Sequence, residues 1–140
     1  MSEISANKIK AYYKTHYRVF YLDNPFVLQI GIHSIELQKL FQQTYKNCAL
    51  FITAFNPYGS TQSDEANLAA HQRMGDYLRS LTESVWEGEG ADPTGQWPAE
   101  QSFLALGINH ETAQLLGNRA HQDAVVWIGP QAIPELILLR

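Results

Sequence analysis

The sequence predicts an α/β fold built on one mixed sheet, with parallel central strands, helices packed on the sheet and an antiparallel hairpin near the N-terminus. Strand-like and helix-like segments alternate from Ala49 to Ile128, which is typical of strands joined by crossover helices. The segment 49–55 is apolar apart from Thr53, as in a strand that is buried on both faces. Segments 17–22 and 26–30 flank an Asp-Asn-Pro turn and therefore predict the hairpin.

Length and composition predict a single domain over residues 1–140. A chain of this length can bury one core, and its hydrophobic content of 45% is typical of globular proteins rather than disordered or fibrous ones. The formal net charge of -4 gives no broad attraction for phosphate backbones, so the composition argues against nucleic-acid binding. The basic residues between Lys8 and Arg18 are interpreted mainly as the solvated face of a first helix.

The sequence also predicts a cytoplasmic protein without a membrane partner. Its first residues lack the basic start and apolar core of a signal peptide, and no apolar run has membrane-spanning length. Cys48 is the one cysteine, which excludes an intrachain disulfide and a cysteine zinc site and predicts a buried thiol. The five histidines form no H-E-x-x-H pattern, so no metal site is expected, and no cofactor is indicated.

Helices are predicted where apolar residues recur at helical spacing after a capping residue. The predicted helices cover 4–14, 34–45, 63–81 and 109–116. Ser34, Ser63 and Asn109 are residue types that cap helix N-termini, and Gly117-Asn118 supplies a stop signal for the last helix. His71 lies on the core-facing row of the longest helix and is interpreted as a hydrogen-bonded packing residue.

Strands are predicted from short apolar or β-branched runs bounded by turn residues. The predicted strands cover 17–22, 26–30, 49–55, 84–86, 102–106, 124–128 and 135–139. Gly88, Gly90 and Gly95 lie in a glycine-rich stretch that predicts a flexible loop. Hairpins near both termini predict antiparallel edges for the sheet.

Polar residues follow the apolar strand 49–55 and begin the longest helix. Ligands in open α/β sheets gather at the carboxyl ends of strands, beside helix N-termini with unpaired N–H groups. Asn56, Ser63 and Asn67 occupy such positions and are candidate ligand-binding residues. Ser63 is better explained as a helix cap, whereas Asn67 either fixes the preceding loop or meets a ligand. Neither of the glycine-rich phosphate-binding patterns occurs.

A second polar cluster precedes the strand at 102–106. Trp97, Glu100 and Ser102 are candidates for a pocket wall, with Glu100 as acid, base or hydrogen-bond acceptor and hence the candidate catalytic residue. The alternative is a tryptophan that covers the sheet edge beside a solvated glutamate. No activated nucleophile is visible in the sequence, which therefore leaves open whether the protein is an enzyme.

Four short motifs occur in a fixed order along the chain. They are Ile52-Thr53-Ala54-Phe55-Asn56-Pro57, Ser63-Asp64-Glu65-x-Asn67, Trp97-Pro98-x-Glu100-x-Ser102-Phe103 and His121-Gln122-Asp123-Ala124. Together they resemble a family of small bacterial proteins catalogued as domain of unknown function 3293, over roughly residues 17–139. The resemblance adds Pro57 and Gln122 to the positions of interest, but it implies no reaction, substrate or catalytic residue. Arg119-Ala120-His121 departs from the run of small residues common in that family.

Two functions follow as hypotheses. The first is a domain that binds a small molecule, nucleotide-like or otherwise anionic, in a pocket at the carboxyl ends of the central strands, where the loop after 49–55 meets 97–102. Asn56 and Asn67 would orient the ligand, Trp97 would stack on it or shield it, and Glu100 would bind a hydroxyl or a base edge. The alternative is a protein-interaction or regulatory module without catalysis, which presents its N-terminal aromatic residues to a partner.

Overall fold

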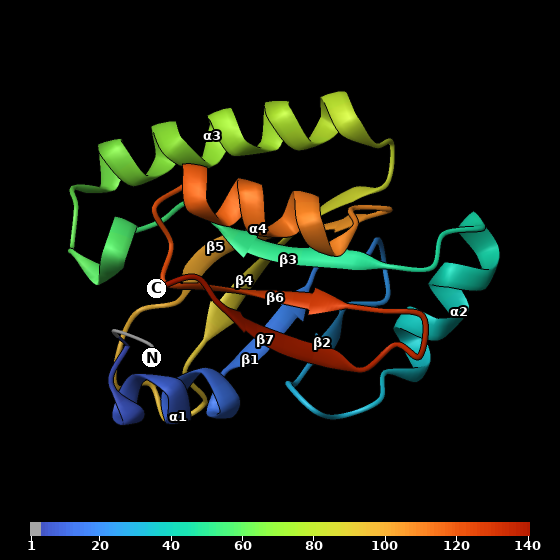
Figure 1. The fold of residues 1–140 in the computed structure, drawn as a ribbon, viewed down its shortest axis with the longest axis horizontal. Coiled ribbons are helices and arrows are strands. Elements are labelled where there is room, and N and C mark those ends of the chain that lie inside the picture. Colours follow the sequence, from blue (N-terminus) through green and yellow to red (C-terminus); the bar gives the residue numbers. More distant parts are fainter. Residues whose placement is uncertain (1–3) are drawn as a thin grey trace.

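A computed structural model describes residues 4–140 and places seven strands in one curled sheet (Figure 1). The strands are β1 (His16–Val19), β2 (Phe26–Leu28), β3 (Ala49–Thr53), β4 (Val85–Ala91), β5 (Glu100–Leu106), β6 (Ala124–Ile128) and β7 (Pro134–Leu138). Their order across the sheet is β2-β1-β4-β5-β3-β6-β7, and all neighbouring pairs are antiparallel. The predicted parallel centre of the sheet is therefore wrong.

The chain connectivity explains why alternating strands and helices did not give parallel neighbours. Helix α3 (Asp64–Leu81) joins β3 to β4, and α4 (His110–Arg119) joins β5 to β6. Each helix connects two strands that run in the same direction, but one strand of opposite direction lies between them: β5 in the first case and β3 in the second. This interleaving is the split β-α-β arrangement of ferredoxin-like folds.

The N-terminal hairpin is confirmed, and it extends the sheet. β1 and β2 pair antiparallel with Arg18 opposite Val27, and β1 pairs on its other side with β4. β4 continues to Ala91, so Gly88 and Gly90 lie in a strand and the flexible loop predicted there is wrong at those positions. Gly88 is required because a Cβ at this position would collide with the main-chain oxygen of Arg18.

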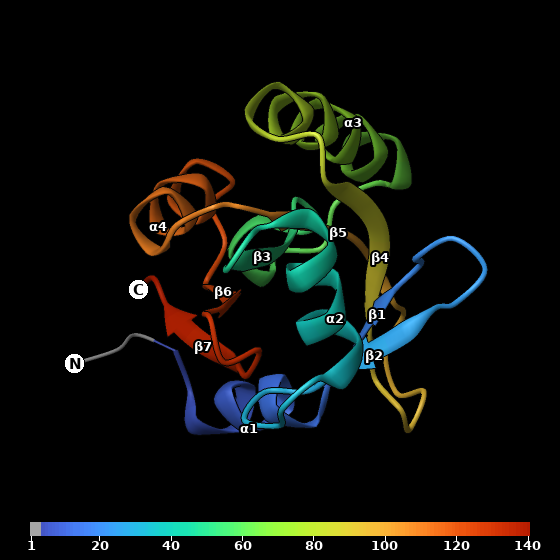
Figure 2. The ribbon, with the colours of Figure 1, turned by 90° about the vertical axis from the view of Figure 1, so that its right-hand side faces the viewer.

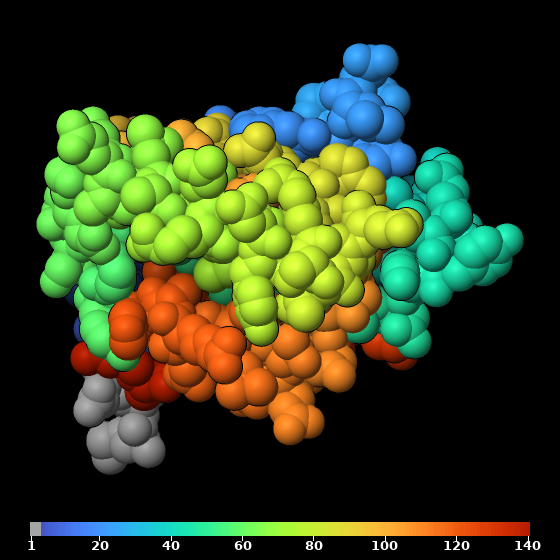
Figure 3. Space-filling model, turned by 90° about the horizontal axis from the view of Figure 1, so that it is seen from above, coloured from blue at the N-terminus to red at the C-terminus, as the bar shows by residue number. Residues whose placement is uncertain are grey.

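Helices cover both faces of the curled sheet. α3 and α4 pack on the outer face, where they lie side by side in the space-filling view (Figure 3), while α2 (Ile35–Thr44) and α1 (Ala6–Lys14) lie on the concave side (Figure 2). The side chains of β3 alternate between these two cores: Phe51 packs inward with α2, and Leu50 and Ile52 pack outward. The burial of β3 on both faces is thus confirmed.

The predicted helix starts are confirmed by their capping bonds. The hydroxyls of Ser34 and Ser63 and the side-chain oxygen of Asn109 each accept a hydrogen bond from the main-chain N–H three residues later. The predicted stop of the last helix is wrong, since α4 runs through Gly117 to Arg119. Among residues 4–140, we find no helix with the length and apolar character needed to cross a bilayer.

Candidate functional site

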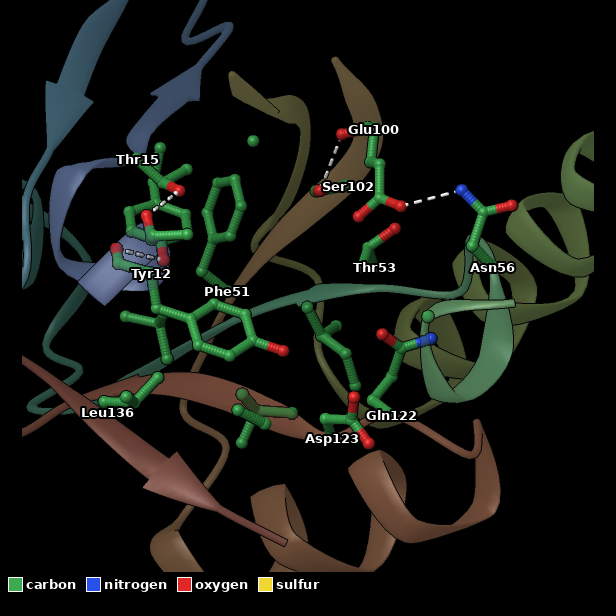
Figure 4. Close-up of a pocket in the computed structure, with 18 of the residues that line it drawn as sticks. Tyr12, Thr15, Phe51, Thr53, Asn56, Glu100, Ser102, Gln122, Asp123 and Leu136 are labelled. Atoms are coloured by element: carbon green, nitrogen blue, oxygen red, sulfur yellow. Dashed lines mark hydrogen bonds between the residues drawn. The ribbon is translucent and has the colours of Figure 1, made fainter. Parts of the chain in front are cut away.

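A cavity of about 340 Å³ lies between α1 and the concave face of the sheet. Its wall is largely apolar and aromatic, with Tyr12 from α1, Tyr17 from β1, Phe51 from β3 and Leu136 from β7 (Figure 4). Volumes of about 300–1,000 Å³ with mostly apolar linings and a few converging polar groups are typical of small-molecule sites. The cavity is thus large enough for a compact organic ligand.

Glu100 and Asn56 form the centre of the polar end of this cavity. Glu100 lies at the first position of β5, and its Oε2 accepts a hydrogen bond of 2.9 Å from Asn56 Nδ2 (Figure 4). Asn56 has a left-handed backbone conformation, with φ of 47°, which asparagine tolerates better than most residues. The bond therefore depends on whatever holds Asn56 in that conformation.

Asn67 on α3 supplies this support from outside the cavity. Its Oδ1 accepts a 2.9 Å hydrogen bond from the main-chain N–H of Asn56, and its Nδ2 donates a 3.0 Å bond to Asn56 Oδ1. The same Oδ1 of Asn56 also accepts from the main-chain N–H of Gln62. Asn67 is buried and does not line the cavity, and its two bonds to Asn56 match the first of the two roles left open for it, that of fixing the loop.

Gln122 and Ser102 extend the polar end and are both buried. Gln122 donates from Nε2 to the main-chain oxygen of Phe55, at 3.1 Å, which fixes the orientation of its amide. Ser102 donates to the main-chain oxygen of Glu100, at 3.0 Å. Both side chains line the cavity, so the structure brings Asn56, Glu100, Ser102 and Gln122 together.

Helix α1 is fastened over the cavity by an ion-pair cluster. The ammonium group of Lys8 contacts Asp123 Oδ2, and Arg140 Nη1 lies 2.6 Å from Asp123 Oδ1. Asp123 is buried directly before β6, while none of the residues of α1 is fully buried. Tyr17 also donates to the main-chain oxygen of Tyr12 at the end of this helix. The cover of the cavity is thus held mainly by polar contacts.

Burial and neighbouring charges shift the pKa of three groups in the cavity. Burial raises the pKa of Glu100, although the bond from Asn56 and the charge of Lys8 partly oppose the rise. Burial, together with the carboxylates of Asp123 and Glu100, raises the pKa of Tyr12, so its hydroxyl stays protonated at neutral pH. Burial would raise the pKa of Asp123 too, but Lys8 and Arg140 outweigh it and hold that pKa below its ordinary value.

One comparison with known proteins gives a match. A family model described as a protein of unknown function (DUF3293) matches residues 52–125, which is more than half of the chain. The chain belongs to the DUF3293 family. No curated protein and no solved structure matches it. The family match covers the polar end of the cavity from Asn56 to Gln122, whereas α1 and Arg140 of this DUF3293 protein lie outside the matched segment.

Two further predicted site residues of the DUF3293 protein, Trp97 and Ser63, do not belong to the buried polar end of the cavity. Trp97 lines the cavity from the loop before β5 but is 45% exposed, and Ser63 caps α3 away from the cavity. The polar end lies at the carboxyl end of β3 but at the amino ends of β5 and β6. A pocket at the carboxyl ends of several strands, as predicted, is wrong because the neighbours of β3 run in the opposite direction.

Sequence reasoning missed three residues of the DUF3293 protein that line the cavity: Lys8, Tyr12 and Asp123. Lys8 was assigned to a solvated helix face, and Tyr12 is one of the N-terminal aromatic residues that the alternative function would present to a partner, yet both line the cavity. Asp123 lay within a quoted motif, and an acidic residue directly before an apolar strand was the signal that could have identified it. These residues come together only because α1 packs against the concave face of the sheet, and no local sequence pattern predicts that packing.

His71 has the packing role predicted for it. Its ring stacks on Phe103 with the ring centroids 4.1 Å apart, and its Nε2 lies 3.1 Å from Glu87 Oε1. The cluster lies on the outer face of the sheet, under α3, and His71 does not line the cavity. Among the described residues, no group of three or more His, Cys, Asp or Glu side chains is arranged to hold a metal ion.

Glu100→Gln is expected to raise the melting temperature at neutral pH. The folded-state pKa of Glu100 lies above its unfolded value of about 4.3, so ionised Glu100 disfavours the folded state. This loss of stability appears as the pH rises through the folded-state pKa, and glutamine is free of it while its side-chain oxygen still accepts from Asn56. Thermal unfolding at pH 7 and pH 4 checks this, since the advantage of the variant should shrink at pH 4. A variant that melts below the parent at pH 7 would contradict it.

Proposed function

We propose that this DUF3293 protein binds a small molecule with a planar ring, such as a nucleobase or a nucleoside, in the cavity between α1 and the sheet. One observation carries the proposal: a cavity with an aromatic wall ends at a point where Asn56, Glu100 and Gln122 converge. Apolar sites that contain a few fixed polar groups are the usual form of small-molecule sites. The polar groups are themselves held by hydrogen bonds to the surrounding chain, which reduces the cost of ordering them on binding.

The aromatic wall favours a planar ring as the body of the ligand. Tyr12 lines the cavity from α1 and Phe51 lines it from β3, and the Tyr12 hydroxyl points into the cavity (Figure 4). Planar heterocycles pack well on such rings. A strongly anionic ligand is less well supported, because Lys8, the cation that lines the described part of the cavity, is already paired with Asp123.

The proposal concerns binding, and Glu100 is the group that connects it to chemistry. A carboxyl group whose pKa is raised by burial in a cavity is suited to accept or give a proton. If a bound ligand is turned over, Glu100 is the residue that would act as general acid or base. A cytoplasmic, bacterial setting stays a prediction from the sequence.

A ligand screen with a cavity-filling variant tests the proposal. Nucleosides, nucleotides, sugar phosphates and small amines are compared by thermal shift on the parent protein and on Ala11→Phe. A ligand at about 100 times its Kd adds about 2.7 kcal/mol to the stability of the parent. Ala11 lines the cavity from α1, so the added ring should occupy the site and remove the shift.

Asn7→Phe is the matched control, because Asn7 lies on the same helix, is exposed and does not line the cavity. It should respond to ligand like the parent. A panel that produces no shift in the parent, or a shift that persists in Ala11→Phe, would show that the cavity is not a small-molecule site.

The alternative function, a protein-interaction module, depended on exposed N-terminal aromatic residues, and their positions in the structure do not favour it. Tyr17 and Phe26 are buried in the inner core, and Tyr12 lines the cavity. Tyr13 and Phe20 are exposed, at 54% and 48%, but single exposed aromatic residues are normal on protein surfaces. The alternative stays a prediction from the sequence.

A further inference from the structure

Most hydrogen-bond donors at the polar end of the cavity are already used within the protein. Asn56 Nδ2 donates to Glu100, and Gln122 Nε2 donates to the main-chain oxygen of Phe55. The hydroxyls of Thr53 and Ser102 donate to main-chain oxygens of β5, at 2.7 and 3.0 Å. Apart from the second N–H of Asn56 Nδ2, a donor from these side chains would become available to a ligand only by breaking an existing bond.

The two cations near the cavity are committed in the same way. Lys8 and Arg140 contact different oxygens of the buried Asp123, and this contact fastens α1 to β6. An anionic ligand that recruited either cation would leave a buried carboxylate with one partner fewer, which is costly. The polar end is therefore poorly suited to a phosphate or a carboxylate group.

Acceptors, in contrast, are available. Among the residues that the structure describes, no hydrogen bond reaches Glu100 Oε1 or Gln122 Oε1, and Figure 4 shows both side chains directed into the cavity. A carboxylate also offers about four acceptor positions, of which Asn56 uses one. The Tyr12 hydroxyl adds a group that can accept as well as donate. The open positions on Glu100 and Gln122 thus require donors from the ligand.

We propose that the ligand presents two adjacent, coplanar N–H donors to Glu100, as a guanine-type base or a guanidinium group does. This inference rests on the proposed function and specifies its ligand class. The two N–H groups would occupy Glu100 Oε1 and the second position on Oε2, in the bidentate arrangement that carboxylates form with such planar donor pairs. Both groups are flat and pack on aromatic rings, which the wall of Tyr12 and Phe51 provides.

Matched ligand pairs test the donor requirement by isothermal titration calorimetry. Guanosine is compared with inosine, which lacks the exocyclic amine, and an alkylguanidine is compared with the alkylamine of equal length. In one of the two pairs, the ligand with the donor pair should bind at least about tenfold more tightly, as expected for hydrogen bonds to a charged group. The pair that shows this preference identifies the source of the donor pair. A 5′-phosphate on guanosine should give no gain.

Two variants separate the role of Glu100 from a general effect on folding. Glu100→Gln keeps the bond from Asn56 but removes the charge and one acceptor, and it should lower the affinity for the preferred ligand at least about tenfold. Glu111→Gln makes the same change on the exposed surface of α4 and should leave the affinity unchanged. Equal binding by Glu100→Gln and the parent would overturn the inference.

The outcomes also distinguish this inference from the proposed function. Preference for inosine, adenosine, an alkylamine or inorganic phosphate, abolished by Ala11→Phe, would leave the cavity a small-molecule site and overturn the donor-pair requirement. If neither pair binds and no ligand in the panel gives a shift that Ala11→Phe removes, both fail together.

Discussion

Gly88→Ala is expected to lower the free energy of unfolding by about 3 kcal/mol, the largest effect that we anticipate for a methyl group in this protein. Gly88 lies in β4 opposite Val19 of β1. An added Cβ would collide with the main-chain oxygen of Arg18 and would lie 3.2 Å from the Phe51 ring. The backbone of β1 cannot move away without losing its pairing with β4. Urea unfolding of the variant and the parent measures the difference.

Gly90→Ala is the matched control, two residues further along the same strand. A Cβ at this position would meet its nearest neighbours, Thr15 and Tyr17, at 3.7 and 4.0 Å, which is ordinary contact. Its free energy of unfolding should change by less than about 1 kcal/mol. If both variants unfold at the same urea concentration, the close approach of β1 to β4 is not as described.

Asn67→Ala is expected to lower the free energy of unfolding by about 2–3 kcal/mol and to weaken ligand binding. The substitution removes both hydrogen bonds to Asn56 and leaves the main-chain N–H of Asn56 without its partner. Asn56 is then less firmly held in its left-handed conformation, and its bond to Glu100 weakens. Thermal unfolding and ligand titration of the same preparation measure the two effects.

Leu68→Ala serves as the control for Asn67→Ala, because Leu68 is the next residue of α3 and is 48% exposed. Leu68→Ala should lower the free energy of unfolding by less than about 1 kcal/mol, because the side chain is half exposed. An unchanged or raised melting temperature in Asn67→Ala would contradict the bracing role. It would instead favour direct contact between Asn67 and a ligand.

Local chemistry was enough to predict most elements and part of the site. Ser34, Ser63 and Asn109 cap their helices through bonds to residues three positions away, so the sequence nearby contains the whole signal. The polar residues at Asn56 and Glu100 were predicted to meet, and they do so at 2.9 Å. They meet because β3 and β5 are antiparallel, which places the carboxyl end of β3 beside the amino end of β5. In the parallel sheet predicted from the sequence, these two ends would have been at opposite edges.

Strand direction was decided only by the tertiary structure. A helix between two strands fixes that they run in the same direction, but it does not fix whether a third strand lies between them. Here β5 inserts between β3 and β4, and β3 between β5 and β6, because those pairings bury Phe103 and Leu104 on the two faces of the sheet. Such contacts join residues about 50 positions apart, as Ile52 and Phe103 are.

The sequence by itself thus determined the helix starts, the N-terminal hairpin, the double burial of β3 and the family. Only the tertiary structure decided that Gly88 belongs to a strand, that Asp123 fastens α1 and that Lys8 and Tyr12 line the cavity. The physical reason is the distance along the sequence between the residues that interact. Caps and turns act over a few residues, whereas the cavity exists because the first helix of the chain lies against strands from its last third.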